Sequence, residues 1–184
     1  MKTGYKPNRV VRELYTPEQR KRRDASVWTL VQGVLAPAQF VIFLVSLYFV
    51  LAYLATGQGY EIATASVVVK TFALYTIMIT GSIWEKVVFG EWLFAKAFFW
   101  EDVFSMLVLA LHTAYLAMVF FGLATPFELM LLALAAYATY VINAAQFIWK
   151  LRAARLQHAR LQAQPARTET DTNKAFPDQL RIAL

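Results

Sequence analysis

Residues 27–55 read VWTLVQGVLAPAQFVIFLVSLYFVLAYLA, an apolar run without a single charged side chain. A helix needs about 20 apolar residues to cross the hydrocarbon core of a bilayer, so this run is long enough to span it. Three more predominantly apolar runs follow at residues 62–88, 98–124 and 127–149. The sequence therefore predicts an all-α, polytopic membrane protein with four transmembrane helices.

The composition agrees with a membrane protein, since 59% of the 184 residues are hydrophobic and only 16% are charged. Cysteine is absent, which excludes disulfides, thiolate metal sites and iron–sulfur clusters. The first and third connections contain the short stretches TGQG and ATP. Short connections join neighbouring helices, so we expect the four helices to form an antiparallel bundle.

Lysine and arginine are distributed unevenly between the two sides of this bundle. Eight lie before residue 24, two lie in segment 84–102 and seven lie from Lys150 onward, whereas loops 56–61 and 124–128 have none. By the positive-inside rule both termini and segment 84–102 are expected to be cytoplasmic. The net charge of +6 then lies at one membrane face, where anionic lipid headgroups explain it better than nucleic acid does.

Two stretches carry the signals of a helix start. In the first, Thr16 stands at an N-cap position, Pro17 follows it and Gln19 lies three residues after the cap, which predicts a capping box. We expect this helix to run from Pro17 directly into the membrane. TPFE at residues 125–128 repeats the same pattern before the last apolar run.

The chain divides by composition into three parts. Residues 1–15 are a basic N-terminal tail, residues 16–152 form the four-helix membrane domain, and residues 153–184 are a basic and then polar C-terminal tail. The end of this tail is rich in polar residues and is expected to be partly disordered.

Polar groups inside the apolar runs are functional candidates, because they are costly in hydrocarbon. Helical spacing places Glu101, Ser105, His112 and Tyr115 on one face of the third run. His112 lies about 16 Å further along the helix axis than Glu101, near the midplane. Lys70 lies inside the second run, and its simplest interpretation is that the amine extends toward the outer headgroups.

Several functional classes lack their required residues. A di-haem cytochrome needs four axial ligands, but the membrane runs contain only His112. A small multidrug exporter is expected to have a carboxylate in its first membrane helix, and residues 25–60 contain none. No glycine-rich phosphate loop, H-E-x-x-H or G-x-S-x-G motif is present.

Segment 84–102, WEKVVFGEWLFAKAFFWED, joins the second and third runs and combines charged with aromatic residues. Its carboxylates are Glu85, Glu91, Glu101 and Asp102. We interpret Glu91 and Lys96 as solvated or interfacial loop residues and keep the other three carboxylates as candidates. The tryptophans of the segment also fit an aromatic belt at the headgroup level.

Four stretches of the chain together resemble one family: YTPEQRKRRDASVWTLVQGVLAP, WEKVVFG, FFWEDVFSMLVLALHTAYL and AAYATYVINAAQFIWKLR. They look like the 3-vinyl (bacterio)chlorophyllide hydratases of bacteriochlorophyll biosynthesis, over residues 15–152. The resemblance implies a hydro-lyase of the bacterial inner or intracytoplasmic photosynthetic membrane. It would add water to the vinyl group on ring A of a magnesium chlorin, giving a 1-hydroxyethyl group. That reaction has no redox step, so no cofactor is expected.

This chemistry suggests roles for the candidate residues. Glu85, Glu101 and Asp102 would divide into a proton donor and a base, because neighbouring carboxyl groups hold a proton unequally. His112 would be an axial ligand to the substrate magnesium or would transfer a proton. The stacking residues for the macrocycle would be Trp84, Phe98, Phe99, Trp100 and Phe104. The other substrate-binding candidates are Tyr115, Asn143 and Gln146.

Two alternatives stay open at this point. A pigment-binding or assembly protein could hold the chlorin through His112 and the aromatic residues without reaction. A proton-coupled carrier could use Lys70 and Glu85. The bundle is small for a chlorin, so we expect a pocket that opens to lipid or a pocket at a homo-oligomer interface.

Overall fold

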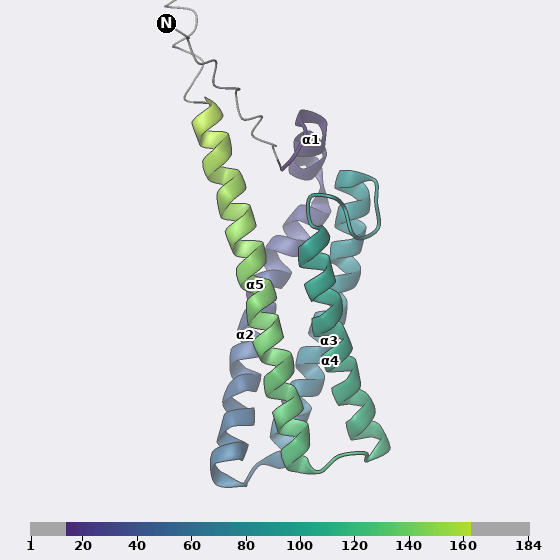
Figure 1. Ribbon diagram of the computed structural model, residues 1–184, viewed down its shortest axis with the longest axis vertical. Helices are drawn as coiled ribbons and strands as arrows, with labels where there is room; N and C mark the ends of the chain where they lie inside the picture. Colours follow the sequence, from purple (N-terminus) through teal and green to yellow (C-terminus); the bar gives the residue numbers. More distant parts are fainter. Residues whose placement is uncertain (1–13, 163–184) are drawn as a thin grey trace, which may run out of the picture. The chain divides into compact units, whose positions relative to one another are not determined.

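The computed structural model describes residues 14–162, and this part of the chain contains helices and no strand (Figure 1). The helices are α1 (Pro17–Ala25), α2 (Val27–Thr56), α3 (Tyr60–Phe89), α4 (Phe99–Phe121) and α5 (Pro126–Gln162). Residues 15–147 form one compact unit, and residues 148–162 continue α5 outside it. The predicted tail before residue 14 and the polar end after residue 162 lie outside the described residues.

The four predicted membrane helices are confirmed. Helices α2, α3, α4 and the Pro126–Leu156 part of α5 are all long and apolar enough to cross a membrane. The described part of the chain is therefore all-α, and its four long apolar helices make it a multi-pass membrane protein.

Both predicted helix starts are also confirmed. Before α1, the Gln19 N–H donates to Thr16 Oγ1 at 3.2 Å and the Gln19 side chain accepts from the Thr16 N–H at 2.9 Å. Before α5, Glu128 Oε2 accepts from the Thr125 N–H at 2.8 Å, and the Glu128 N–H donates to Thr125 Oγ1 at 3.3 Å. Each pair satisfies backbone donors that the first turn of a helix leaves without a partner.

The prediction of a continuous helix from Pro17 into the membrane is wrong, because the chain breaks at Ser26. Ser26 has extended backbone angles (φ −84°, ψ 128°), and its side chain accepts from the Trp28 N–H at 3.2 Å. A serine hydroxyl offers the backbone this alternative partner and so favours a new helix start. The basic helix α1 is thereby separated from α2, and it contacts α3.

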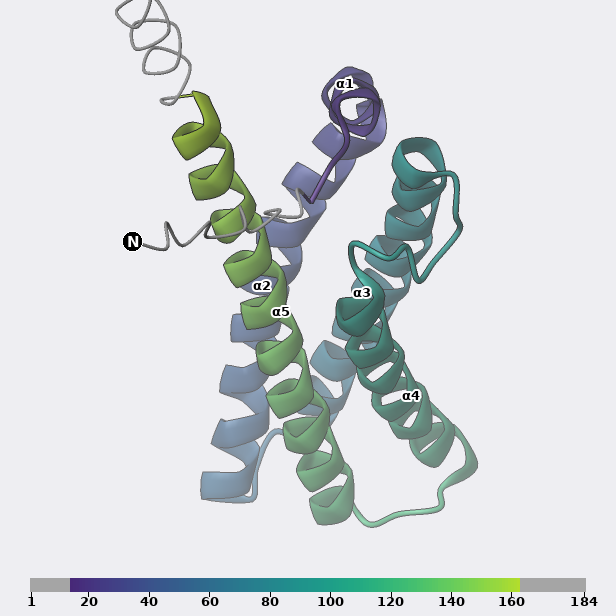
Figure 2. The ribbon, with the colours of Figure 1, turned by 45° about the horizontal axis from the view of Figure 1, so that its top comes forward.

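The long helices α2, α3 and α4 end at glycines in the left-handed conformation. Gly57, Gly90 and Gly122 have φ values of 70°, 88° and 63°, which glycine adopts without the steric cost of a Cβ atom. Three residues join α2 to α3 and four join α4 to α5. The nine-residue connection between α3 and α4, residues 90–98, is the longer one, and Figures 1 and 2 show it at the same end as α1.

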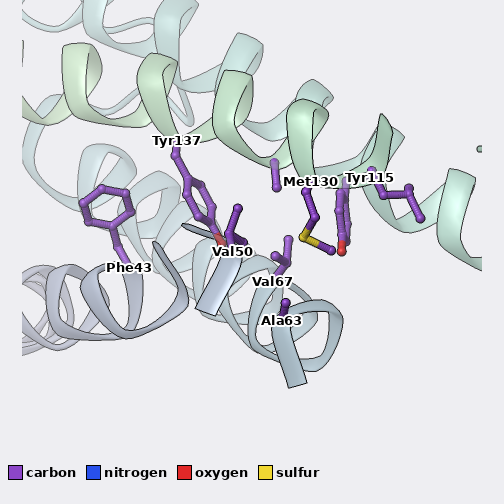
Figure 3. Close-up of a cluster of buried hydrophobic side chains, with 9 residues drawn as sticks. Phe43, Val50, Ala63, Val67, Tyr115, Met130 and Tyr137 are labelled. Carbon is purple, nitrogen blue, oxygen red and sulfur yellow. The ribbon is translucent and has the colours of Figure 1, made fainter. Parts of the chain in front are cut away.

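An apolar core joins the membrane helices of the 15–147 unit (Figure 3). Phe43 of α2 packs edge-on against Tyr137 of α5, with ring centroids 5.3 Å apart. Tyr115 of α4 lies beside Met130 of α5, and both are wholly buried. The core residues belong to the second halves of α2 and α4 and to the first halves of α3 and α5, so the core lies toward the short connections. The polar groups described below lie at the middle of the bundle and at its other end.

Candidate functional site

Two carboxyl groups from different helices meet where α3 ends and α4 begins. Glu85, in the last turns of α3, and Asp102, in the first turn of α4, are 5% and 4% exposed, and their side chains are within hydrogen-bonding reach of each other. A hydrogen bond between two carboxyl groups requires a proton on one of them. We call Glu85 and Asp102 the carboxyl pair. Glu101 is also buried, beside Asp102 in the first turn.

The carboxyl pair also holds the α3–α4 connection. Asp102 Oδ2 accepts from the Phe94 N–H at 2.9 Å, and Glu85 Oε2 accepts from the Ala95 N–H at 3.4 Å. Phe94 has a φ of 60°, a left-handed conformation that costs a residue with a side chain about 1 kcal/mol or more. The bond to Asp102 therefore stabilises a strained turn and fixes the loop backbone over the pair.

An aromatic cluster packs next to this loop. Phe98 is 1% exposed, and its ring lies 5.7 Å from Trp84 and 5.8 Å from both Phe89 and Phe147. Tyr15 stacks on Phe89 at 5.7 Å. Burial raises the pKa of the Tyr15 hydroxyl above its usual value, and the nearby Arg23 opposes this shift.

The predicted stacking residues are divided between this cluster and the surface. Trp84 and Phe98 pack together, and the Trp84 Nε1–H donates to Thr29 Oγ1 at 2.9 Å. Phe99 and Trp100 are 45% and 67% exposed in the 15–147 unit. Phe104 is partly buried on α4. Phe99 and Trp100 contact each other, with ring centroids 5.5 Å apart, and their exposed parts can meet lipid or a ligand, whereas Phe98 is buried among its ring partners.

His112 lies in the interior of the bundle, well away from the carboxyl pair along α4. It is wholly buried, and its Nδ1 is 2.8 Å from the Val108 carbonyl oxygen. A carbonyl oxygen only accepts, so Nδ1 carries the proton and the neutral ring has a lone pair on Nε2. Nε2 has no hydrogen-bond partner among the described residues. This arrangement suits a metal ligand or a proton acceptor.

Other buried polar atoms at this level also lack partners among residues 14–162. The Asn143 side chain donates to Ser105 Oγ at 2.8 Å, but its Oδ1 accepts nothing, and neither Gln39 Nε2 nor Gln146 Oε1 has a partner. Buried polar atoms of folded proteins are nearly always hydrogen-bonded, and those that are not require an explanation such as a ligand site. We call Lys70, His112, Gln39 and Asn143 the interior polar group.

The expectation that Lys70 extends toward the outer headgroups is wrong. Its side chain is wholly buried, and Nζ lies 4.0 Å from the centroid of the Tyr140 ring. It also interacts electrostatically with His112. A cation over a shielded ring gains about 2 kcal/mol, whereas burying an unpaired ion costs several kcal/mol. Tyr140 therefore offsets only part of the cost, and Nζ has no hydrogen-bond partner in the described part of the chain.

The predicted catalytic residues thus occupy two levels. Glu85, Glu101 and Asp102 lie together at the loop end, while His112 lies about 16 Å further along α4 than Glu101. Tyr115 is part of the apolar core. Among the described residues, no cluster of three or more His, Cys, Asp or Glu side chains could hold a metal ion.

Two tyrosines of α5 that face the interior, Tyr137 and Tyr140, were not among the predicted site residues. The Tyr137 hydroxyl is 2.6 Å from Ser46 Oγ, its ring is 5.9 Å from His112, and Tyr140 lies under Lys70. Tyr137, Tyr140 and Asn143 are spaced by three residues, and that spacing on an apolar helix is a signal that they share one side.

The fold and these two groups define a multi-pass helical membrane protein that buries carboxyl groups at one end and basic and amide groups in its middle. A family profile described as 2-vinyl bacteriochlorophyllide hydratase matches residues 15–153. The chain belongs to this family.

Two relatives carry the same description. The one from Cereibacter sphaeroides is 69% identical over 146 residues, which cover 79% of this chain and 90% of the relative. The one from Rhodobacter capsulatus is 66% identical over 146 residues, covering 79% and 85%. No solved structure matches the chain. The family suggested by the sequence motifs is therefore confirmed.

Proposed function

We propose that this protein is a hydro-lyase that adds water to the vinyl group on ring A of a bacteriochlorophyllide and forms the 1-hydroxyethyl product. The observation that carries the proposal is the family match, which extends over nearly all of the membrane part of the chain. The high identity to relatives named for this reaction favours it over a pigment-binding protein without activity. The names of the same relatives support a bacteriochlorophyllide as the substrate.

The carboxyl pair can supply both proton transfers of the reaction. A proton from one carboxyl group adds to the terminal CH2 of the vinyl group, and the resulting cation is delocalised into the macrocycle. Water then attacks the inner carbon and loses a proton to the other carboxylate, so that one water is added in total. Support comes from the geometry, because two buried carboxyl groups in contact share a proton and can exchange roles. Glu101 is a third candidate at the same helix start.

His112 is proposed to hold the substrate at its magnesium. The lone pair on Nε2 is buried and has no partner among residues 14–162, and Nδ1–H is fixed by Val108. Asp102 and His112 are ten residues apart, or about 15 Å along the helix axis. The two side chains would therefore contact different parts of the substrate. Trp84, Phe98, Phe99, Trp100 and Phe104 remain stacking candidates, and Tyr115, Asn143 and Gln146 remain binding candidates.

We also propose the topology and location that the sequence suggested. The four membrane helices would be antiparallel, with both termini and the α3–α4 connection on the cytoplasmic face of a bacterial inner membrane, near anionic lipids. The basic helix α1 and the α3–α4 connection at one end support this orientation (Figure 1). The bundle is small for a chlorin, so the pocket would open to lipid or be completed by a second copy of the chain.

The test of the function is a turnover assay in membranes that contain the full-length protein. The membranes are supplied with 3-vinyl bacteriochlorophyllide, and the loss of vinyl conjugation should shift the red absorption band to shorter wavelength. Mass spectrometry should show the gain of one water per pigment. Membranes without the protein are the control. Pigment that copurifies with the protein but stays unchanged would contradict the hydratase and support a binding protein.

The absence of cysteine allows a direct test of the topology. Gln58→Cys lies between α2 and α3, and Lys96→Cys lies in the α3–α4 connection; both positions are exposed. A maleimide that cannot cross membranes should label Gln58→Cys in intact spheroplasts and should label Lys96→Cys only after lysis. The reverse pattern would overturn the proposed orientation.

A further inference from the structure

Lys70 is a buried basic side chain in a position that the proposed chemistry does not use. It is wholly buried in the middle of the bundle, and its Nζ donates no hydrogen bond to any described residue. Its contacts are the Tyr140 ring at 4.0 Å and an electrostatic interaction with His112. Neither of these supplies a negative charge, so the ammonium group has no counter-ion within the described part of the chain.

The other members of the interior polar group also have buried polar atoms. His112 Nε2, Gln39 Nε2 and Asn143 Oδ1 are buried and also lack partners among residues 14–162. Amide and ammonium N–H groups donate to an anionic oxygen, and charge-assisted hydrogen bonds of this kind are the stronger ones. The unpartnered donors of the interior polar group are Lys70 Nζ and Gln39 Nε2, whereas His112 Nε2 and Asn143 Oδ1 are acceptors, so it is the ammonium group of Lys70 that can bind a negatively charged oxygen group.

The other buried charged side chains have the opposite sign. Within residues 14–162 they are Glu85, Glu101 and Asp102, all at the α3–α4 end. Lys70 and Glu85 are fifteen residues apart on α3, or about 22 Å along its axis. The buried charges of the bundle therefore form two separate poles, with carboxyl groups at the loop end and a cation in the middle.

We propose that Lys70 binds the propionate carboxylate of the bacteriochlorophyllide and so orients the macrocycle with its vinyl group toward the carboxyl pair. This inference rests on the proposed function. A bacteriochlorophyllide is a free acid, and its carboxylate needs a cation once it leaves water. Lys70 supplies that cation, while the carboxyl groups at the other pole repel the same carboxylate. The uncharged vinyl group is then the part of the substrate that reaches Glu85 and Asp102.

The orientation makes Lys70 a positioning residue that acts at a distance from the reacting bond. Its contribution depends on the charge of the propionate and is independent of the vinyl chemistry. A substrate whose propionate is a methyl ester has the same vinyl group and the same magnesium, but it has no charge to pair with Lys70. Comparing acid and ester therefore isolates the proposed contact from every other contact of the macrocycle.

The test measures kcat and KM for the acid and for its methyl ester with wild type, Lys70→Met and Lys70→Arg. Wild type should prefer the acid about 10- to 100-fold in kcat/KM, the range for one charged hydrogen-bonded contact. Lys70→Met should raise KM for the acid and leave the ester unchanged, so that the preference disappears. Lys70→Arg should restore part of the preference. Lys21→Met, an exposed lysine of α1, is the matched control and should keep the wild-type ratio.

Three outcomes separate the two proposals. No hydration of the acid by wild type would contradict the proposed function itself. Normal hydration with equal kcat/KM for acid and ester, or an unchanged preference in Lys70→Met, would overturn the role of Lys70 alone. If Lys70→Met does not accumulate in membranes, the acid and ester comparison in wild type and Lys70→Arg still decides, since a preference for the acid that arginine keeps only in part supports the contact, whereas a preference that arginine leaves unchanged contradicts it.

Discussion

The two buried polar regions of this protein differ in how their groups are partnered. At the α3–α4 end, the two side chains of the carboxyl pair contact each other and accept hydrogen bonds from the backbone N–H groups of Phe94 and Ala95. In the middle of the bundle, Lys70 and His112 have buried atoms that no described residue satisfies. Partnered groups hold a loop in place as well as being available for chemistry, whereas unpartnered groups cost stability until a ligand arrives. The comparison therefore separates a hydrogen-bonded structure at one end from buried atoms in the middle that have no partner among the described residues.

The largest expected effect is on turnover, from removing the shared proton of the carboxyl pair. Asp102→Asn and Glu85→Gln keep an oxygen that can accept the loop N–H but cannot transfer the proton, so kcat should fall about 10²- to 10⁴-fold. The absorption assay measures turnover, and immunoblotting of membranes measures the amount of protein. Glu91→Gln, an exposed carboxylate of the same connection, should retain wild-type turnover. If both amide variants keep full activity, the carboxyl pair holds the loop and does not transfer the proton.

The next effect is on stability at the same end. Phe98→Ala removes the central ring of the aromatic cluster and should lower the free energy of unfolding by about 3 to 5 kcal/mol, as large-to-small changes in packed cores do. Thermal unfolding in detergent, followed by circular dichroism, measures the change. Phe99→Ala is the matched control, because its ring is 45% exposed. Equal melting temperatures for the two variants would show that the cluster does not hold this end together.

His112 should show the opposite behaviour, since it belongs to the unpartnered region. His112→Leu removes a buried polar atom that has no partner, so the melting temperature of the ligand-free protein should stay the same or rise. Substrate binding should weaken about 10-fold or more, the value of one good polar contact. Pigment titration followed by absorption measures the binding. If His112→Leu is strongly destabilised and its affinity for the pigment is unchanged, His112 is a structural residue. The difference between the partnered carboxyl end and the unpartnered interior would then not hold.

The smallest expected effect comes from a polar contact that is satisfied inside the bundle. Tyr137→Phe removes the hydroxyl that lies 2.6 Å from Ser46 and should cost about 0.6 to 2 kcal/mol, the range for hydrogen bonds between membrane helices. Tyr48→Phe, at a tyrosine that is 68% exposed, serves as the control. The difference in melting temperature between the two variants gives the size of this contact. A larger loss than in Phe98→Ala would place the main source of stability in the middle of the bundle.

Much of the fold could be predicted because its signals are local. Apolar length set the four membrane helices, and the Thr16 and Thr125 caps set two of the helix starts. The break at Ser26 was missed, although a serine before an apolar run is itself a cap signal. The capping box at Thr16 pointed to one long helix, and nothing in the intervening residues obliges a helix to end. The serine side chain decided between the two arrangements only once α1 could pack against α3.

The candidate site could be predicted in part. Helical spacing placed Ser105 and His112 on one side of α4, and both are buried. The contact between Glu85 and Asp102 depends on how the connection folds back, and the strained conformation of Phe94 leaves no mark in the sequence. Lys70 was misjudged for a similar reason, because the long side chain of a lysine in a membrane helix can extend outward or turn inward, and the choice depends on which rings face it.

By itself, the sequence determined that this chain is an all-α membrane protein, where two of its helices begin, and to which family it belongs. These properties depend on apolar length, on caps that act within a few residues, and on motifs that can be read along the chain. The tertiary structure alone decided which buried groups are partnered. It brought Glu85 and Asp102 together and left Lys70 Nζ and His112 Nε2 without a hydrogen-bond partner among the described residues, because such contacts depend on how different helices pack against one another. The division between a loop-holding carboxyl pair and an interior region of unpartnered polar atoms is therefore a property of helix packing.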